Sequence, residues 1–276
     1  MEKLLQYLQY DFVQYAFIVG ILIALCSAIL GSVIVTKKMS FIGDGLSHVA
    51  FGATTVASVL SFTNSIYLVL PVTIIFSIFL MKNTENKKTP NDAMLAVISV
   101  GGLAFGYMCL NLFSNSSNLS GDVCGFLFGA TSILTLTIDK VIVCVILSIL
   151  VIVSFIIFYN KIYAVTFDET FSEVAGTNLK AYKVLIAVLI DTIIVLSMNL
   201  VGALLISALI ILPTLTAMRL CKSFKIIVII SAIISIIGAL TGLIISILFG
   251  TPVGCTIVSV DICIFIISYV ISLVKR

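Results

Sequence analysis

The stretch "FVQYAFIVGILIALCSAILGSVIVTKKMSFIGDGLSHVAFGATTVASVLS", residues Phe12 to Ser61, decides the fold class of this chain. It contains two long apolar runs, Phe12–Thr36 and Phe41–Ser61, and the second run carries the only histidine among the 276 residues. A run of roughly 20 apolar residues is long enough for an α-helix to cross the ~30 Å hydrocarbon core of a membrane. The two runs therefore predict two membrane-spanning helices.

The rest of the chain continues this pattern. The composition is 61% hydrophobic and 10% charged, whereas a soluble domain carries about 25% charged residues. Nine apolar segments can be drawn: Phe12–Thr36, Phe41–Ser61, Ser65–Met81, Ala93–Phe113, Ile138–Tyr159, Ala181–Met198, Val201–Leu220, Ile226–Phe249 and Val253–Val274. The split near Asn199 is placed there because residues 181–220 are about two spans long. We expect an all-α, polytopic helical membrane protein with about eight or nine transmembrane helices, and a single transmembrane domain over residues 1–276.

The basic residues predict how the helices are oriented. Only Lys3 and Lys140 fall on one side of the predicted spans, and the other thirteen fall in alternate loops or at the C-terminus: Lys37, Lys38, Lys82, Lys87, Lys88, Lys161, Lys180, Lys183, Arg219, Lys222, Lys225, Lys275 and Arg276. Loops rich in lysine and arginine stay in the cytoplasm, so the C-terminus is predicted to be cytoplasmic. This alternation leaves no crossing for the apolar stretch Gly121–Thr137, which is predicted to be a re-entrant helix on the outer side.

Small residues predict where helices pack closely. The spacing G-x-x-x-G occurs at Gly102 and Gly106 and again at Gly238 and Gly242. Such spacings let two helix backbones approach each other in a membrane.

Asp44 and His48 are the candidate site of this chain. They are four residues apart, so their side chains share one face of a helix. Ionisable groups in membrane spans usually mark a path for ions or substrate, and a carboxylate with an imidazole suits zinc, manganese or iron. Gly43 and Gly45 are expected to loosen the helix. The alternative is that Asp44 and Ser47 only cap a helix near the inner interface, with His48 packed beside them.

The number of ligands bears on the oligomeric state. One chain offers one aspartate and one histidine here, whereas zinc usually takes four ligands. Two copies related by a two-fold axis would supply four, which favours a homodimer. Asp191 and Asp261 also lie in apolar runs, and we expect them to be neutral or hydrogen-bonded where helices pack.

The inner loop Asn160–Lys183 predicts a short helix. Thr166 or Asp168 can cap a helix that passes through Phe171 to Ala175, and Gly176 can end it. Its acidic residues near the start suit the helix dipole: Asp168, Glu169 and Glu173. Its apolar side suggests a docking partner: Phe167, Phe171 and Val174. The alternative is a surface helix without a role.

Several functions are not supported by the sequence. The chain has no G-x-x-x-x-G-K-[ST] phosphate-binding loop, so a transport ATPase would have to be another polypeptide. A single histidine leaves no arrangement of a nucleophile with a base. We therefore expect no enzyme activity, no permanently bound cofactor and no nucleic-acid partner.

Four stretches resemble one family. "KKMSFIGDGLSHVAFGA" (Lys37–Ala53), "VTFDETFSEVAGTN" (Val165–Asn178), "VGALLISALIILPTLTAMRL" (Val201–Leu220) and "GLIISILFGTPVGCTIV" (Gly242–Val258) look like blocks of the permease subunits of bacterial ABC importers for zinc, manganese and iron(II), the ABC-3 type. They follow the order of that family and cover nearly the whole chain.

The resemblance implies a homodimeric permease in the bacterial plasma membrane. It implies cytoplasmic ATP-binding subunits, an extracellular metal-binding lipoprotein that delivers the metal, and Asp44 and His48 on the metal path. It also implies an ATPase-coupling segment that includes Asp168, Glu169, Phe171, Glu173 and Gly176.

The residues after the histidine bear on which metal is transported. Manganese members often have Leu-Pro-Gly there, whereas this chain reads "HVAFGA" and looks more like the zinc-importing branch. Zinc is therefore the expected substrate. The alternatives are a manganese or iron(II) importer, or a stand-alone metal channel or secondary transporter.

Overall fold

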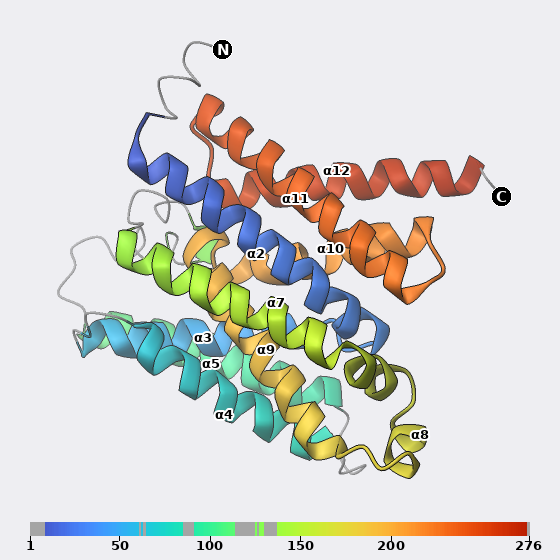
Figure 1. The fold of residues 1–276 in the computed structure, drawn as a ribbon. Coiled ribbons are helices and arrows are strands. Elements are labelled where there is room, and N and C mark those ends of the chain that lie inside the picture. Colours follow the sequence, from blue (N-terminus) through green and yellow to red (C-terminus); the bar gives the residue numbers. More distant parts are fainter. Residues whose placement is uncertain are drawn as a thin grey trace.

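The computed structural model describes residues 9–60, 62, 65–84, 91–113, 125, 127–129 and 137–274. This part of the chain is helical and contains no strand (Figure 1). The helices are α2 (Asp11–Thr36), α3 (Ile42–Val59), α4 (Ile66–Thr84), α5 (Asn91–Phe113), α7 (Ile138–Phe167), α8 (Glu169–Val174), α9 (Leu179–Val201), the 3-10 turn η1 (Ala203–Leu205), α10 (Ile206–Leu220), α11 (Phe224–Phe249) and α12 (Val253–Val274). The all-α prediction is confirmed.

Each predicted apolar segment coincides with one of these helices. Within the described ranges, six helices are long and apolar enough to cross a membrane: α2, α5, α7, α9, α11 and α12. The apolar parts of α4 and α10 are shorter, and the total of eight or nine crossings stays a prediction. The predicted split near Asn199 lies at Gly202, whose φ of +89° a side chain would rarely tolerate and which ends α9.

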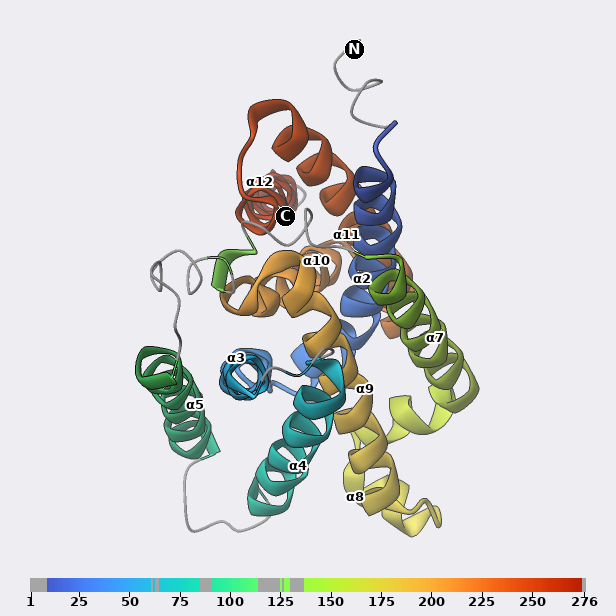
Figure 2. The same cartoon turned by 90° about the vertical axis from the view of Figure 1, so that its left-hand side faces the viewer.

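The helices form two groups around a shared middle. Figures 1 and 2 show α3, α4 and α5 on one side, α11 and α12 on the other, and α2, α9 and α10 between them. Small and hydroxyl side chains allow the close approach in the middle, as the Ser32 Oγ atom of α2 lies 3.3 Å from the Ser231 Oγ atom of α11. Such contacts replace the hydrophobic effect that drives packing in water.

Both predicted G-x-x-x-G pairs lie in tight helix contacts. A Cβ atom added to Gly106 of α5 would lie 3.0 Å from the Cα atom of Gly52 in α3. A Cβ atom added to Gly242 of α11 would lie 2.7 Å from the Cα atom of Ile257 in α12. The predicted close packing is confirmed for both pairs.

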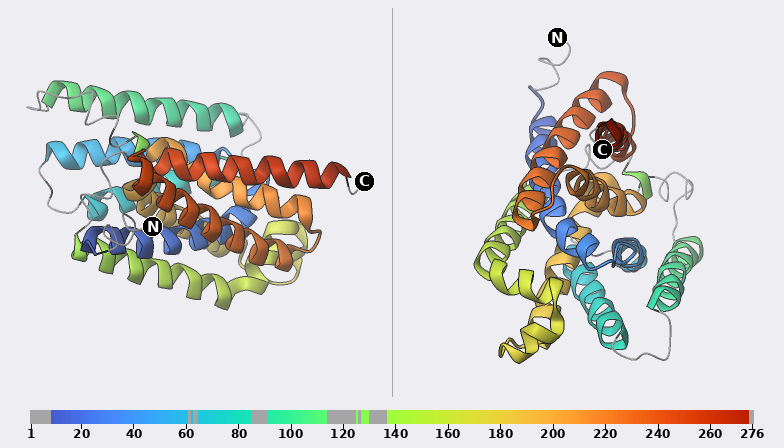
Figure 3. Two further views of the ribbon diagram at one scale, coloured as in Figure 1. Left: turned by 90° about the horizontal axis from the view of Figure 1, so that it is seen from above. Right: turned by 90° about the vertical axis from the view of Figure 1, so that its right-hand side faces the viewer.

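The loops that carry the basic residues gather at one end of the bundle. Figure 3 shows this end with the end of α2, the connection through α8, the α10–α11 turn and the C-terminus. This grouping is what alternate cytoplasmic loops require, and the orientation in a membrane stays a prediction. The re-entrant helix predicted at residues 121–137 falls largely outside the described residues.

Candidate functional site

Helix α3 carries the candidate metal site and lies inside the bundle. Figure 2 shows it nearly end-on between α5, α4, α9 and α10. From Gly45 to Thr55 every residue of α3 is buried. A helix enclosed in this way can hold ionisable side chains away from lipid, as a path for a cation requires.

Asp44 and His48 lie side by side on α3, as their spacing predicted. The His48 Nε2 atom is 3.6 Å from the Asp44 Oδ1 atom. This is longer than a hydrogen bond, but a zinc ion about 2.1 Å from both atoms would separate them by about 3.4 Å at a tetrahedral angle. The histidine is 7% exposed, and the aspartate side chain is 41% exposed. The pair therefore offers two ligand atoms with one open side.

The capping alternative is wrong. Phe41 is the N-cap of α3, and no side chain caps this end. The Ser47 Oγ atom donates to the Asp44 carbonyl oxygen at 2.7 Å instead of capping the first turn. The expected loosening by Gly43 and Gly45 is also wrong, since α3 runs unbroken from Ile42 to Val59. Gly45 instead leaves space for the Leu95 side chain of α5, which a Cβ atom there would clash with.

Within the described part of the chain, no third protein ligand joins the pair. Among the residues that the structure describes, no three His, Cys, Asp or Glu side chains lie close enough to share a metal ion. Asp191 and Asp261 are buried elsewhere, in α9 and α12. The expectation that each is neutral or hydrogen-bonded stays a prediction.

The short helix α8 forms at the place that its capping residues predicted. The Asp168 Oδ1 atom accepts hydrogen bonds from the Phe171 N–H at 2.9 Å and from the Thr170 hydroxyl at 2.6 Å. These two bonds lower the pKa of the Asp168 carboxyl. At the other end Gly176 has a φ of +77° and closes a Schellman motif, in which the Thr177 N–H bonds the Ser172 carbonyl.

The apolar side of α8 faces outward. Phe171 is 66% exposed, Val174 is 89% exposed, and Phe167 before the helix is also exposed. Glu173 and Gly176 are exposed as well. A patch of large apolar side chains at the polar end of a membrane bundle indicates a surface that a partner covers.

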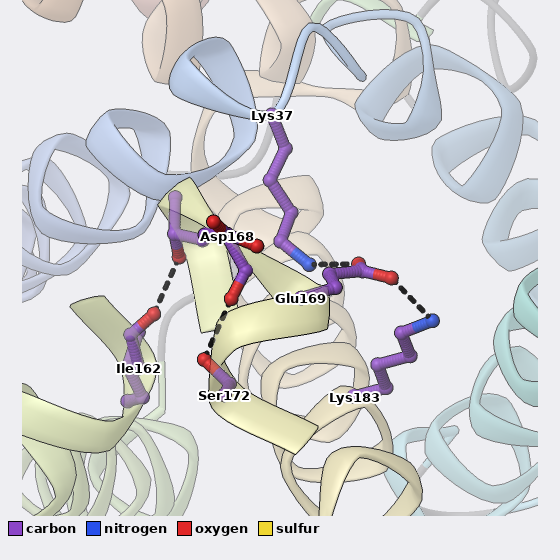
Figure 4. Close-up of polar contacts among 7 residues, drawn as sticks. Lys37, Ile162, Asp168, Glu169, Ser172 and Lys183 are labelled. Carbon is purple, nitrogen blue, oxygen red and sulfur yellow. Dashed lines mark hydrogen bonds and ion pairs between the residues drawn. The ribbon is translucent and has the colours of Figure 1, made fainter. Parts of the chain in front are cut away.

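Glu169 behaves differently from the other residues of the predicted coupling segment. Its carboxylate turns back toward the bundle, where it binds Lys37 at 3.0 Å and Lys183 at 2.8 Å (Figure 4). Nothing in the sequence indicated this network. Lys37 and Glu169 are 132 positions apart, and the positions of the lysines indicated only which loops are cytoplasmic.

The chain resembles known transport proteins along its whole length. A family model for the ABC 3 transport family matches residues 9–272. The high-affinity zinc uptake system membrane protein ZnuB of Haemophilus influenzae is 29% identical over 253 residues, which are 92% of this chain and 95% of that protein. The manganese transport system membrane protein MntC of Listeria monocytogenes is 25% identical over 267 residues, 96% of this chain and 92% of that one.

A solved structure shares the fold. The structure of PsaBC from Streptococcus pneumoniae in complex with Fab contains a chain that superposes with a TM-score of 0.86 at 24% identity, covering 97% of this chain and 94% of that one. The match of the family model over nearly every described helix decides the classification. The chain belongs to the ABC 3 transport family.

Proposed function

We propose that this chain is the membrane-spanning subunit of an ATP-driven importer of a divalent transition metal, with zinc as its substrate. The observation that carries the proposal is the Asp44–His48 pair on the buried helix α3. An imidazole and a carboxylate are ligands for zinc, and their separation of 3.6 Å suits one shared cation. The zinc uptake function of the ZnuB relative agrees with this substrate.

The working unit in this proposal is a homodimer. A single chain brings two ligands, and within the described residues no further His, Cys, Asp or Glu completes the set. A second copy facing the half-exposed Asp44 would bring the total to four, the usual number for zinc. The metal is transported substrate in this scheme, so the ligands must also release it.

Cytoplasmic ATP-binding subunits would dock on α8. The exposed Phe167, Phe171 and Val174 form an apolar patch, and large aromatic anchors dominate the energy of protein interfaces. An extracellular metal-binding lipoprotein would deliver the metal at the opposite end of the bundle. This arrangement places the protein in the bacterial plasma membrane with the α8 end and the C-terminus in the cytoplasm, as the basic loops predict.

Manganese is the second candidate substrate. The manganese transport relative MntC aligns with 96% of this chain, and a histidine–aspartate pair also accepts manganese. The "HVAFGA" stretch after His48 favours zinc.

The experiment is metal uptake by the complete transporter in proteoliposomes, reconstituted with its ATPase and binding protein. Labelled zinc and labelled manganese are supplied separately, with and without ATP. The proposal predicts ATP-dependent uptake with zinc preferred over manganese. Uptake of neither metal would contradict it, and ATP-independent uptake by the permease alone would favour a channel.

A further inference from the structure

Glu169 joins α8 to the end of α2, which is distant in the chain, and to the following helix α9. Its Oε1 atom binds the Lys37 Nζ atom at the end of α2, and its Oε2 atom binds the Lys183 Nζ atom in α9. Figure 4 shows the carboxylate between the two lysines, with α8 carrying it. Each carboxylate oxygen therefore serves one ammonium group. We call these three residues the Glu169 triad.

Lys37 depends on the glutamate more than a surface lysine would. The side chains of Lys37 and Lys183 are 11% and 16% exposed, whereas that of Glu169 is 45% exposed. Largely buried ammonium groups need a paired charge, and removing one partner of a buried pair costs more than an exposed pair contributes. Without the carboxylate, two like charges would also remain close together. The triad therefore differs from an ordinary surface ion pair.

Lys37 sits in a defined turn that leads into the metal-bearing helix. It is the C-cap of α2, and the next residue, Lys38, has a left-handed φ of +57°. The Met39 N–H bonds the Ile34 carbonyl and the Lys38 N–H bonds the Val35 carbonyl, both at 3.0 Å, which makes a Schellman motif. Residues 38–41 connect α2 to α3, so a movement of Lys37 reaches α3 through a short turn of fixed geometry.

A small cavity lies beside the turn on the side of α4 and α9. Its volume is about 30 Å³, and it is lined by Lys37, Met39 and Ile42 together with residues of α4 and α9, among them Ser77 and Ile190. The ion pair with Glu169 is a polar contact that joins the turn to α8.

We propose that Glu169 is a positioning residue that transmits movements of α8 to the α2–α3 turn, and so to Asp44 and His48. This inference rests on the proposed function, in which ATPase subunits move α8. The apolar side of α8 receives the movement, and the side that faces the bundle passes it on through the Glu169–Lys37 pair. The ion pair with Lys183 holds the same carboxylate against α9, and α9 packs against α3. ATP hydrolysis and the state of the metal site are thereby linked through a salt bridge within one chain.

The test compares variants of Lys37 and Glu169 in the complete reconstituted transporter. The readout is the number of metal ions imported per ATP hydrolysed. Lys37→Met and Glu169→Gln should lower this ratio at least fivefold while the ATPase subunits stay bound. Lys37→Arg keeps the charge and should stay within twofold of the wild type. A change in the amount of folded protein leaves the ratio unaffected, because both quantities are measured on the same complexes.

A charge swap tests the pair itself. In a Lys183→Met background, where position 169 no longer faces a second ammonium group, the swap Lys37→Glu, Glu169→Lys should recover at least half of the ratio of Lys183→Met, which also decides the matter if Lys37→Met does not fold. Lys225→Met, at an exposed lysine at the same end of the bundle, serves as the matched control and should leave the ratio unchanged.

Three outcomes would overturn the proposal separately from the function. Wild-type coupling in Lys37→Met, or equal loss in Lys37→Arg and Lys37→Met, would show that the pair transmits nothing. A swap variant as uncoupled as the single variants would also contradict the pair. A wild-type complex that imports neither zinc nor manganese would instead overturn the proposed function, and this inference with it.

Discussion

Two neighbouring glycines of α5 allow a controlled test of how tightly α3, the helix that carries Asp44 and His48, is held. A Cβ atom added to Gly102 would lie 2.9 Å from the His48 carbonyl oxygen and 3.0 Å from the Val49 nitrogen, whereas a Cβ atom added to Gly101 would meet no atom within 4 Å. Both glycines lie inside the same helix. Gly101→Ala and Gly102→Ala therefore raise the helix propensity of α5 equally. Only the added methyl group of Gly102→Ala meets α3.

The size of the difference follows from these distances. Ordinary carbon contacts begin near 3.4 Å, so the two helices must separate by roughly half an ångström in Gly102→Ala. The atoms in the way are backbone atoms of α3, which cannot rotate aside. Inserting one carbon into a packed interface costs about 1–3 kcal/mol. Gly101→Ala should instead gain up to about 1 kcal/mol, as glycine is the weaker helix former.

The assay is thermal unfolding of the two purified variants in detergent, followed by zinc uptake in proteoliposomes. Gly102→Ala should unfold at a lower temperature than Gly101→Ala, and its uptake should be slower because the backbone of His48 is displaced. Equal stability of the two variants would refute the close contact between α3 and α5 at His48.

Three further predictions concern the inner end of the molecule. Phe171→Asp should weaken binding of the ATPase subunit at least roughly tenfold, since an unpaired carboxylate in an apolar interface costs more than about 1.4 kcal/mol; unchanged binding in a titration would exclude α8 as the docking surface. The Glu169 ion pairs should stay intact between pH 6 and 8, so they should cause no change in the number of metal ions imported per ATP over this range. Burial raises the pKa of Glu169, but the hydrogen bonds and charges of Lys183 and Lys37 outweigh it and lower the pKa overall. The stabilisation by these pairs is thus present above the ordinary glutamate value of about 4.3 and is lost only as the pH falls below it; a Lys37→Met variant with the same ratio as the wild type at pH 6 but not at pH 8 would contradict this. Finally, a cysteine introduced at Thr137 should react with an impermeant reagent added outside the cell and one at Ser223 should not, in a background without the native cysteines; the reverse pattern would invert the topology.

The helices could be predicted from the sequence because each depends on neighbouring residues. The length of an apolar run sets a membrane helix, and Asp168 and Gly176 mark the ends of α8 through local hydrogen bonds. The pairing of Asp44 with His48 also followed from spacing along one helix. Two boundaries were misplaced. The break between α9 and α10 lies at Gly202, and the polar Asn199 lies within α9; α7 continues to Phe167, past its predicted end at Tyr159.

Contacts between distant segments could not be predicted in this way. Gly102 and Gly106 indicated a close helix contact, but nothing in the sequence identified α3 as the partner. The turn that ends α2 has Lys38 in the left-handed conformation, at a position where glycine is usual. The sequence therefore did not mark this turn, and capping by Asp44 remained an open alternative. The sequence indicated only that Glu169 lies near the start of a helix. Its binding to Lys37 depends on the position of α8 beside the end of α2.

The most direct test of the metal path is zinc uptake by the double variant Asp44→Asn, His48→Ala in the complete reconstituted transporter. The variant adds no buried charge, so membrane insertion and binding of the ATPase subunits should be normal and serve as controls. Each substitution occurs in both copies of the dimer and removes two of the four ligands, so the double variant loses all four. Because loss of outer-shell partners alone weakens metal sites 10–100-fold, the account predicts that uptake falls at least roughly 100-fold. Uptake at the wild-type rate by the well-expressed variant would contradict a metal path through Asp44 and His48.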